Sequence, residues 1–104
     1  MFARVATFEG GDRQRRRELN EQRMKDGTLD PPEGIKSVLL LEDAENDRSL
    51  FLTFFESREA IAAAEARFAQ MGEEIPEDVR GRRVALDVYE VAFSLDASDA
   101  AVGS

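Results

Sequence analysis

The chain of 104 residues contains no cysteine, no histidine and no tryptophan. Without cysteine it can form neither a disulfide nor a thiolate nucleophile. Without histidine it can build neither a Ser-His-Asp triad nor a haem site ligated by imidazole, and the usual thiolate and imidazole zinc sites are excluded within one chain. We therefore expect no cofactor and no tightly bound metal.

Long apolar runs are also absent. No stretch approaches the roughly 18 apolar residues that a membrane span requires, and Met1 is followed directly by an alternating segment instead of a basic and then apolar signal region. We therefore expect a cytoplasmic protein with no membrane partner.

Positive charge is scarce, because the net charge is -8. Nucleic-acid binding depends on a positive surface, so this balance argues against such a partner. Six basic residues are nevertheless concentrated in one short segment, between Arg13 and Lys25. The rest of the chain is strongly acidic.

The pattern of apolar residues predicts four strands and two helices. Asp12 can cap a helix over residues 13–25 that stops at Gly27, and Ser57 can cap a second helix that stops at Gly72. The second helix has an apolar stripe at three- and four-residue spacing, formed by Ile61, Ala64, Phe68 and Met71. Strands are predicted over residues 2–8, 35–42, 49–55 and 82–93, the middle two being joined by the turn-rich Asp43–Arg48 segment.

The order β-α-β-β-α-β is typical of an α+β, ferredoxin-like plait with a four-stranded antiparallel sheet. A strand with one face in solvent should alternate apolar with polar residues. Residues 38–41 and 50–52 are instead unbroken apolar runs. Because both helices cover the same face, a second copy of the sheet is the simplest cover for the other face. We therefore predict a homodimer formed through the sheet face.

The whole chain is short enough for a single domain. We place this domain at residues 1–93. The remaining residues, 94–104, are small and polar, which is typical of a flexible C-terminal tail.

Four segments, in their order and spacing, resemble the antibiotic biosynthesis monooxygenase superfamily of dimeric α/β barrels. They are MFARVATFEG, PEGIKSVLLLED, FESREAIAAAE and DVYEVAF, which together extend over about residues 1–93. The family's strand-to-helix junction is commonly Trp-Glu-Ser, and here it reads Phe55-Glu56-Ser57. The resemblance implies a dimeric barrel with a pocket between the helices and the sheet, and in some members cofactor-independent oxidation of phenolic polyketides.

Arg16, Asn20 and Arg23 lie at about one-turn spacing on the first predicted helix. They could line a pocket for an anionic ligand, because this helix face offers little apolar cover beyond Leu19. The alternative is that the arginine stems pack over the sheet while their charged heads stay in water.

Arg4 lies on the first strand, which is central in the predicted plait, so its charge needs a partner. Asp87 on the neighbouring last strand is the expected structural partner, and a ligand carboxylate or phenolate is the functional alternative. Tyr89 could orient an aromatic ligand, and Phe55 could line an aromatic cavity, although both residue types are also common in cores. The acidic hairpin lacks EF-hand spacing, so we expect no calcium there.

Two functions therefore remain open. One is a cofactor-independent oxygenase or isomerase with a small aromatic or anionic substrate, contacted by residues such as Arg4, Asn20 and Tyr89. The other is a non-catalytic ligand-binding or interaction dimer whose pocket is filled by side chains. An open cavity of a few hundred Å³ would favour the first, and a packed interior the second.

Overall fold

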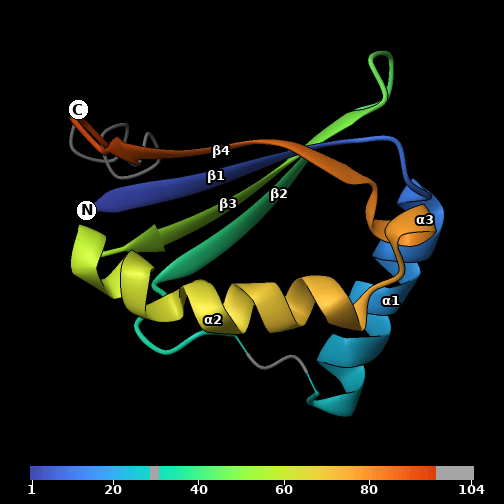
Figure 1. The fold of residues 1–104 in the computed structure, drawn as a ribbon, viewed down its shortest axis with the longest axis horizontal. Coiled ribbons are helices and arrows are strands. Elements are labelled where there is room, and N and C mark those ends of the chain that lie inside the picture. The colour runs from blue at the N-terminus through green and yellow to red at the C-terminus, as the bar shows by residue number, and fades with distance from the viewer. Residues whose placement is uncertain (29–30, 96–104) are drawn as a thin grey trace, which may run out of the picture.

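A computed structural model describes residues 1–28 and 31–95. The chain has an α+β fold in which four antiparallel strands form an open sheet in the order β2-β3-β1-β4. The elements follow the chain as β1 (Phe2–Glu9), α1 (Arg13–Asp26), β2 (Ser37–Asp43), β3 (Arg48–Phe55), α2 (Arg58–Glu74), α3 (Glu77–Arg80) and β4 (Arg82–Glu90). The helices lie on one side of the sheet (Figure 1), an arrangement compatible with the predicted plait.

The two long helices begin where the sequence predicts. Asp12 accepts a hydrogen bond from the Arg15 amide at 3.0 Å, and Ser57 accepts one from the Ala60 amide at 3.1 Å. Gly27 ends α1 in the left-handed conformation, with φ 67°. The predicted limits of α1 are thus confirmed to within one residue.

The predicted end of α2 at Gly72 is wrong, because the helix continues to Glu74. A single glycine costs a helix only about 1 kcal/mol. Here the carbonyl of Gly72 also accepts a hydrogen bond from Nη1 of Arg80 at 2.7 Å. After Pro76 the chain forms the short helix α3, in a segment that the sequence predicts to be a plain connection.

The last strand is shorter than predicted and ends at Glu90 instead of Phe93. It pairs with β1, and Phe2 is opposite Glu90 at the end of that ladder. One further backbone bond joins the Val91 amide to the Met1 carbonyl at 2.9 Å. Beyond it, residues 92–95 have no strand beside them in the described part of the chain.

The predicted hairpin is confirmed, with strands at Ser37–Asp43 and Arg48–Phe55. Its turn is held locally, since Asp43 accepts a bond from the Asn46 amide at 3.4 Å and one from Nδ2 of Asn46 at 2.6 Å. The bond from the Asn46 side chain is the main reason that the pKa of Asp43 lies below its usual value.

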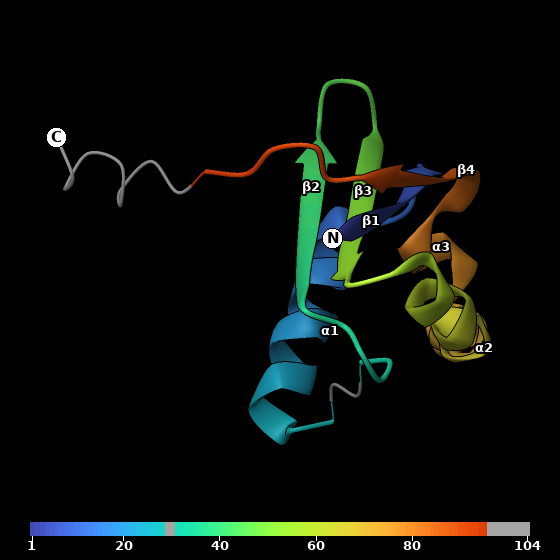
Figure 2. The ribbon, with the colours of Figure 1, turned by 90° about the vertical axis from the view of Figure 1, so that its left-hand side faces the viewer.

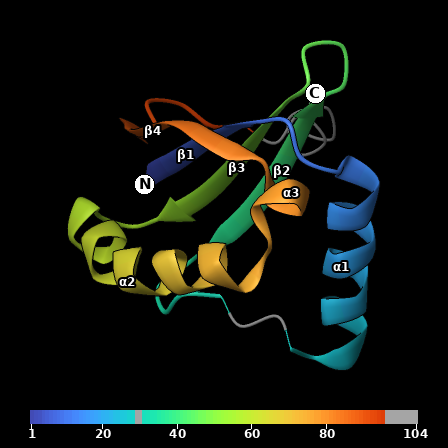
Figure 3. The same ribbon diagram turned by 45° about the vertical axis from the view of Figure 1, so that its right-hand side comes forward.

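The core lies between α2 and the sheet. The predicted stripe is confirmed, because Ile61, Ala64 and Phe68 are buried and Met71 packs against them. Phe55 is fully buried in this cluster and meets Phe68 edge to face, with ring centroids 6.1 Å apart. Figures 2 and 3 show that α1 stands apart from α2 and runs in a different direction, so the core is built mainly under α2.

Strand pairing fixes which residues face the helices. Arg4, Thr53 and Val38 share one row across β1, β3 and β2, and the burial of Thr53 places this row on the helix side. The next row, Val5, Leu52 and Leu39, points to the opposite side, which no helix of the described chain covers. We call this second side the open face.

The prediction that Arg4 pairs with Asp87 is wrong. Asp87 is opposite Val5 in the β1–β4 ladder, whereas Arg4 is opposite Val88. Successive side chains of a strand point to opposite faces, so Asp87 lies on the open face and Arg4 on the helix face. Asp87 is therefore one position away from the residue opposite Arg4, and its side chain points to the other face of the sheet.

Candidate functional site

Helix α1 has little apolar surface with which to dock. Its 14 residues, RQRRRELNEQRMKD, include only Leu19 and Met24 as large apolar side chains. An amphipathic helix normally buries an apolar stripe against its sheet. Here the arginines provide the attachment instead.

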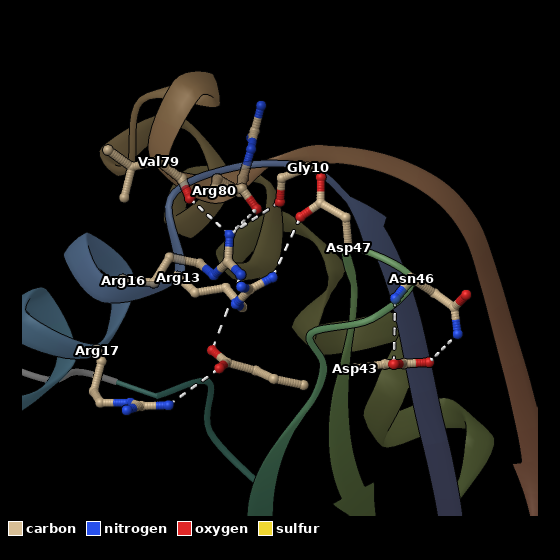
Figure 4. Close-up of polar contacts among 10 residues, drawn as sticks. Gly10, Arg13, Arg16, Arg17, Asp43, Asn46, Asp47, Val79 and Arg80 are labelled. Carbon is tan, nitrogen blue, oxygen red and sulfur yellow. Dashed lines mark hydrogen bonds and ion pairs between the residues drawn. The ribbon is translucent and has the colours of Figure 1, made fainter.

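Arg16 is the central attachment and is buried, with an exposed fraction of 8%. Its Nη1 donates to the carbonyl oxygens of Val79 at 2.9 Å, Gly10 at 3.2 Å and Arg80 at 3.4 Å (Figure 4). A Cβ at Gly11 would collide with the same guanidinium, so glycine is required beside it. Arg16 thus fastens the start of α1 to α3 through Nη1, whereas its buried Nε has no hydrogen-bond partner among the described residues.

Arg23 fastens the other end of α1. Its Nη1 lies 3.5 Å from Oε2 of Glu74 at the end of α2, and Nη1 of Arg67 donates to Oε1 of the same carboxylate at 2.9 Å. The hydrogen bond from Arg67 is the main cause that lowers the pKa of Glu74, and the charge of Arg23 adds to it.

A groove remains between α1 and the edge strand β2, with a volume of about 330 Å³. Its wall on α1 is formed by Arg17, Asn20, Glu21 and Met24, and its wall on β2 by Leu40 and Glu42. Leu40 belongs to the helix face of the sheet but is still 38% exposed. The separation of α1 from the sheet therefore leaves an accessible hollow with an apolar side.

One end of the groove is polar and carries both signs of charge. Glu42 lies 3.3 Å from Nη2 of Arg17 and 3.9 Å from Nη2 of Arg16, and its side chain is 18% exposed. Glu21 adds a second carboxylate to the lining. With two carboxylates and one lining arginine, the groove is better suited to a neutral hydrogen-bonding ligand than to a strong anion.

The six residues predicted to bind a ligand are not brought into one pocket within the chain. Only Asn20 lines the groove. Arg16 and Arg23 hold α1 in place through the contacts given above. The other three are Arg4 and Phe55, which are buried on the helix face, and Tyr89, which is 57% exposed on the open face.

Arg4 is paired within the chain instead of facing a cavity. Its Nε donates to Oε1 of Glu65 at 2.8 Å, its Nη2 donates to Oε2 at 3.2 Å, and its guanidinium carbon lies 3.9 Å from the centre of the Phe68 ring. Burial without a partner would be costly for this charge. The prediction that Arg4 forms a structural ion pair is thus confirmed, but its partner is Glu65 on α2 instead of Asp87.

Five residues that line the groove are not among those predicted from the sequence to bind a ligand, namely Arg17, Glu21, Met24, Leu40 and Glu42. Of these, Leu40 lies in a segment that stands out in the sequence, the apolar run at residues 38–41, and the same run also fits a dimer interface. Of the described residues, no group of three or more acidic side chains is arranged to hold a metal ion. No helix in the described ranges has the length and apolar character needed to cross a membrane.

No family model matches the chain, and no curated protein matches its sequence.

Proposed function

We propose that this protein is a small-molecule-binding homodimer of the ferredoxin-like, dimeric α/β-barrel type, with its ligand in the groove between α1 and β2. The observation that carries the proposal is the groove itself, whose volume of about 330 Å³ lies at the lower end of the range for ligand sites. It combines an apolar side at Met24 and Leu40 with polar groups at Asn20 and Glu42. Ligand pockets commonly have this mixture.

A neutral phenol fits this lining best. Its ring would lie against Met24 and Leu40, where a thioether makes favourable contact with an aromatic edge. Its hydroxyl would donate to the Glu42 carboxylate and accept from the Asn20 amide. The two carboxylates that line the groove would repel a carboxylate ligand. Of the aromatic or anionic ligands inferred from the sequence, we therefore favour the uncharged aromatic ones.

The second copy is supported by the open face of the sheet. Leu39 is 50% and Leu41 47% exposed there, next to Leu50 and Leu52 on β3. A leucine-rich face without helices is the type of surface that monomeric proteins rarely leave in water. The sheet face therefore supports a homodimer.

Activity as a cofactor-independent oxygenase or isomerase is the finer form of this proposal, and it follows from the sequence resemblance. The alternative is a non-catalytic interaction dimer with a filled interior. For the space under α2, that alternative is favoured by the fully buried Phe55, which packs there in one cluster with Ile61 and Phe68. It does not bear on the groove beside α1, which is open.

Amide NMR spectra of the protein titrated with simple phenols test the binding site. We expect shifts confined to residues around Asn20, Met24 and Leu40, and we expect Asn20→Ala to weaken binding by about tenfold through the lost hydrogen bond. Gln22→Ala is the matched control, because Gln22 is exposed on the same helix but does not line the groove. Shifts elsewhere, or equal effects of the two variants, would contradict the proposed site.

Oxygen uptake in the presence of a bound phenol separates an oxygenase from a binding protein. Uptake that depends on Asn20 would support catalysis. Binding without uptake would favour the non-catalytic function.

A further inference from the structure

The groove between α1 and β2 adjoins a second hollow. This hollow has a volume of about 810 Å³ and lies along α1, where Asp47 of the hairpin turn contributes to its wall. Arg17 and Glu21 line both spaces. A ligand held in the groove can therefore carry a substituent that extends toward the hollow.

The hollow is acidic, and its two arginines are already paired. Nη1 of Arg13 lies 3.5 Å from Oδ1 of Asp47, and Nη2 of Arg17 lies 3.3 Å from Oε2 of the groove residue Glu42 (Figure 4). Three carboxylates of the lining form no ion pair with any described residue, namely Asp12, Glu18 and Glu21. A cationic group would offset this excess of negative charge, whereas an anion would be repelled.

Glu21 is the one of these three carboxylates that also lines the groove. Asp12 is occupied as the cap of α1, and Glu18 accepts a hydrogen bond from Nε2 of Gln14 at 3.3 Å. Within the described chain, no hydrogen bond or ion pair occupies the Glu21 carboxylate, although Lys25 lies one turn further along α1. Glu21 is thus available to a cationic group of a ligand.

We propose that the ligand of the groove is a phenol that carries an ammonium group, and that the Glu21 carboxylate binds this ammonium. This inference rests on the proposed function, because it keeps the ring against Met24 and Leu40 and the hydroxyl at Asn20 and Glu42. Glu21 lies three residues before Met24, and residues three apart are neighbours on one side of a helix. A short substituent on the ring therefore reaches Glu21.

The exposure of Glu21 sets the size of the expected effect. A hydrogen bond between an ammonium and a carboxylate is stronger than one between neutral groups. Water and salt weaken such a pair when it is exposed. We therefore expect the ammonium to improve binding by about five- to tenfold.

Three phenols that differ mainly in the charge of one substituent test the inference. Tyramine carries an ammonium, para-ethylphenol is neutral, and para-hydroxyphenylpropionate carries a carboxylate. Amide NMR titrations at low salt give the dissociation constant of each ligand and the residues that it contacts. We expect tyramine to bind most tightly and the propionate most weakly, and we expect the preference for tyramine to shrink as salt is added.

A matched pair of variants tests the assignment of Glu21. Glu21→Gln keeps the size of the side chain but removes its charge, so the dissociation constants of tyramine and para-ethylphenol should become about equal. Glu73→Gln removes the same charge from an exposed position on α2 that lines neither the groove nor the hollow, and it should keep the preference for tyramine.

The outcomes separate failure of this inference from failure of the proposed function. Binding of para-ethylphenol in the groove with no gain for tyramine, or a gain that survives Glu21→Gln, would overturn the role of Glu21 and leave the proposed binding site standing. If none of the phenols shifts the groove residues, both proposals fail. Butylamine has the ammonium without the ring and should bind much more weakly than tyramine. Equal affinities of these two amines would show that only the acidic surface attracts them, and would also overturn the inference.

Discussion

Arg4 of β1 and Glu65 of α2 form a two-point ion pair, with Nε to Oε1 at 2.8 Å and Nη2 to Oε2 at 3.2 Å. The two partners differ in burial, because the Arg4 side chain is 4% exposed whereas that of Glu65 is 44% exposed. The pair therefore connects a buried cation with a carboxylate that still reaches water. The consequences of removing either partner should be unequal.

Glu65→Met should be the more harmful of the two single changes. It leaves the Arg4 guanidinium buried without a counterion, and loss of one partner of a buried pair costs about 3 to 5 kcal/mol. We expect the loss in the free energy of unfolding to lie near the lower limit of this range, because Phe68 still stacks on the guanidinium. Arg4→Met should cost less, since the Glu65 carboxylate can turn to solvent.

Urea unfolding of the two single variants and of the double variant Arg4→Met with Glu65→Met tests this order. The double variant should be more stable than Glu65→Met alone, because no buried charge remains. A larger loss for Arg4→Met than for Glu65→Met would contradict the assignment.

Arg16→Met should loosen α1. The substitution leaves the carbonyls of Val79, Gly10 and Arg80 without their shared donor, and we expect a loss of about 3 kcal/mol in the free energy of unfolding. Arg15→Met is the matched control, because Arg15 is the exposed neighbour on the same helix. Chemical denaturation measures both, and similar stabilities would show that Arg16 does not attach the helix.

Glu74 should make stability depend on pH in the acidic range. Its pKa is lowered from 4.5, mainly by the hydrogen bond from Arg67, so the folded state binds the proton less well than the unfolded state does. The stabilising effect is therefore fully present above this ordinary value and disappears as the pH falls through the lower pKa of the folded state.

Thermal unfolding of Glu74→Gln against wild type measures this effect. We expect a small decrease in melting temperature at neutral pH that vanishes in acid, since the carboxylate is then protonated in both states. Glu73→Gln, an exposed neighbour, controls for the loss of one charge. A difference that grows as the pH falls would contradict the expected direction of the pH dependence.

Local signals predicted most of the secondary structure, because they act within a few residues. The caps at Asp12 and Ser57 and the stripe through Ile61 and Phe68 lie where the sequence places them. The true end of α2 depends on a contact from Arg80, eight residues beyond Gly72, which no local pattern reveals. The end of β4 depends on where its neighbour β1 begins.

The candidate site was harder to predict because it depends on register and on the position of α1. A shift of one residue in the β1–β4 ladder separates Arg4 from Asp87, and composition cannot supply that register. The groove exists because the arginines hold α1 beside β2 without an apolar stripe. Arg16, Asn20 and Arg23 do lie about one turn apart on α1, but Arg16 and Arg23 bind protein groups that do not line the groove.

Sedimentation equilibrium at micromolar concentration tests the proposed homodimer most directly, with wild-type protein compared with Leu52→Lys and Gln22→Lys. Leu52 lies near the centre of the open face and Gln22 on the exposed side of α1, so the two changes add the same charge in different places. We predict a dimer for wild type and Gln22→Lys and a folded monomer for Leu52→Lys, because a charge buried in a sheet interface is costly. A wild-type protein that sediments as a monomer at this concentration would contradict the homodimer.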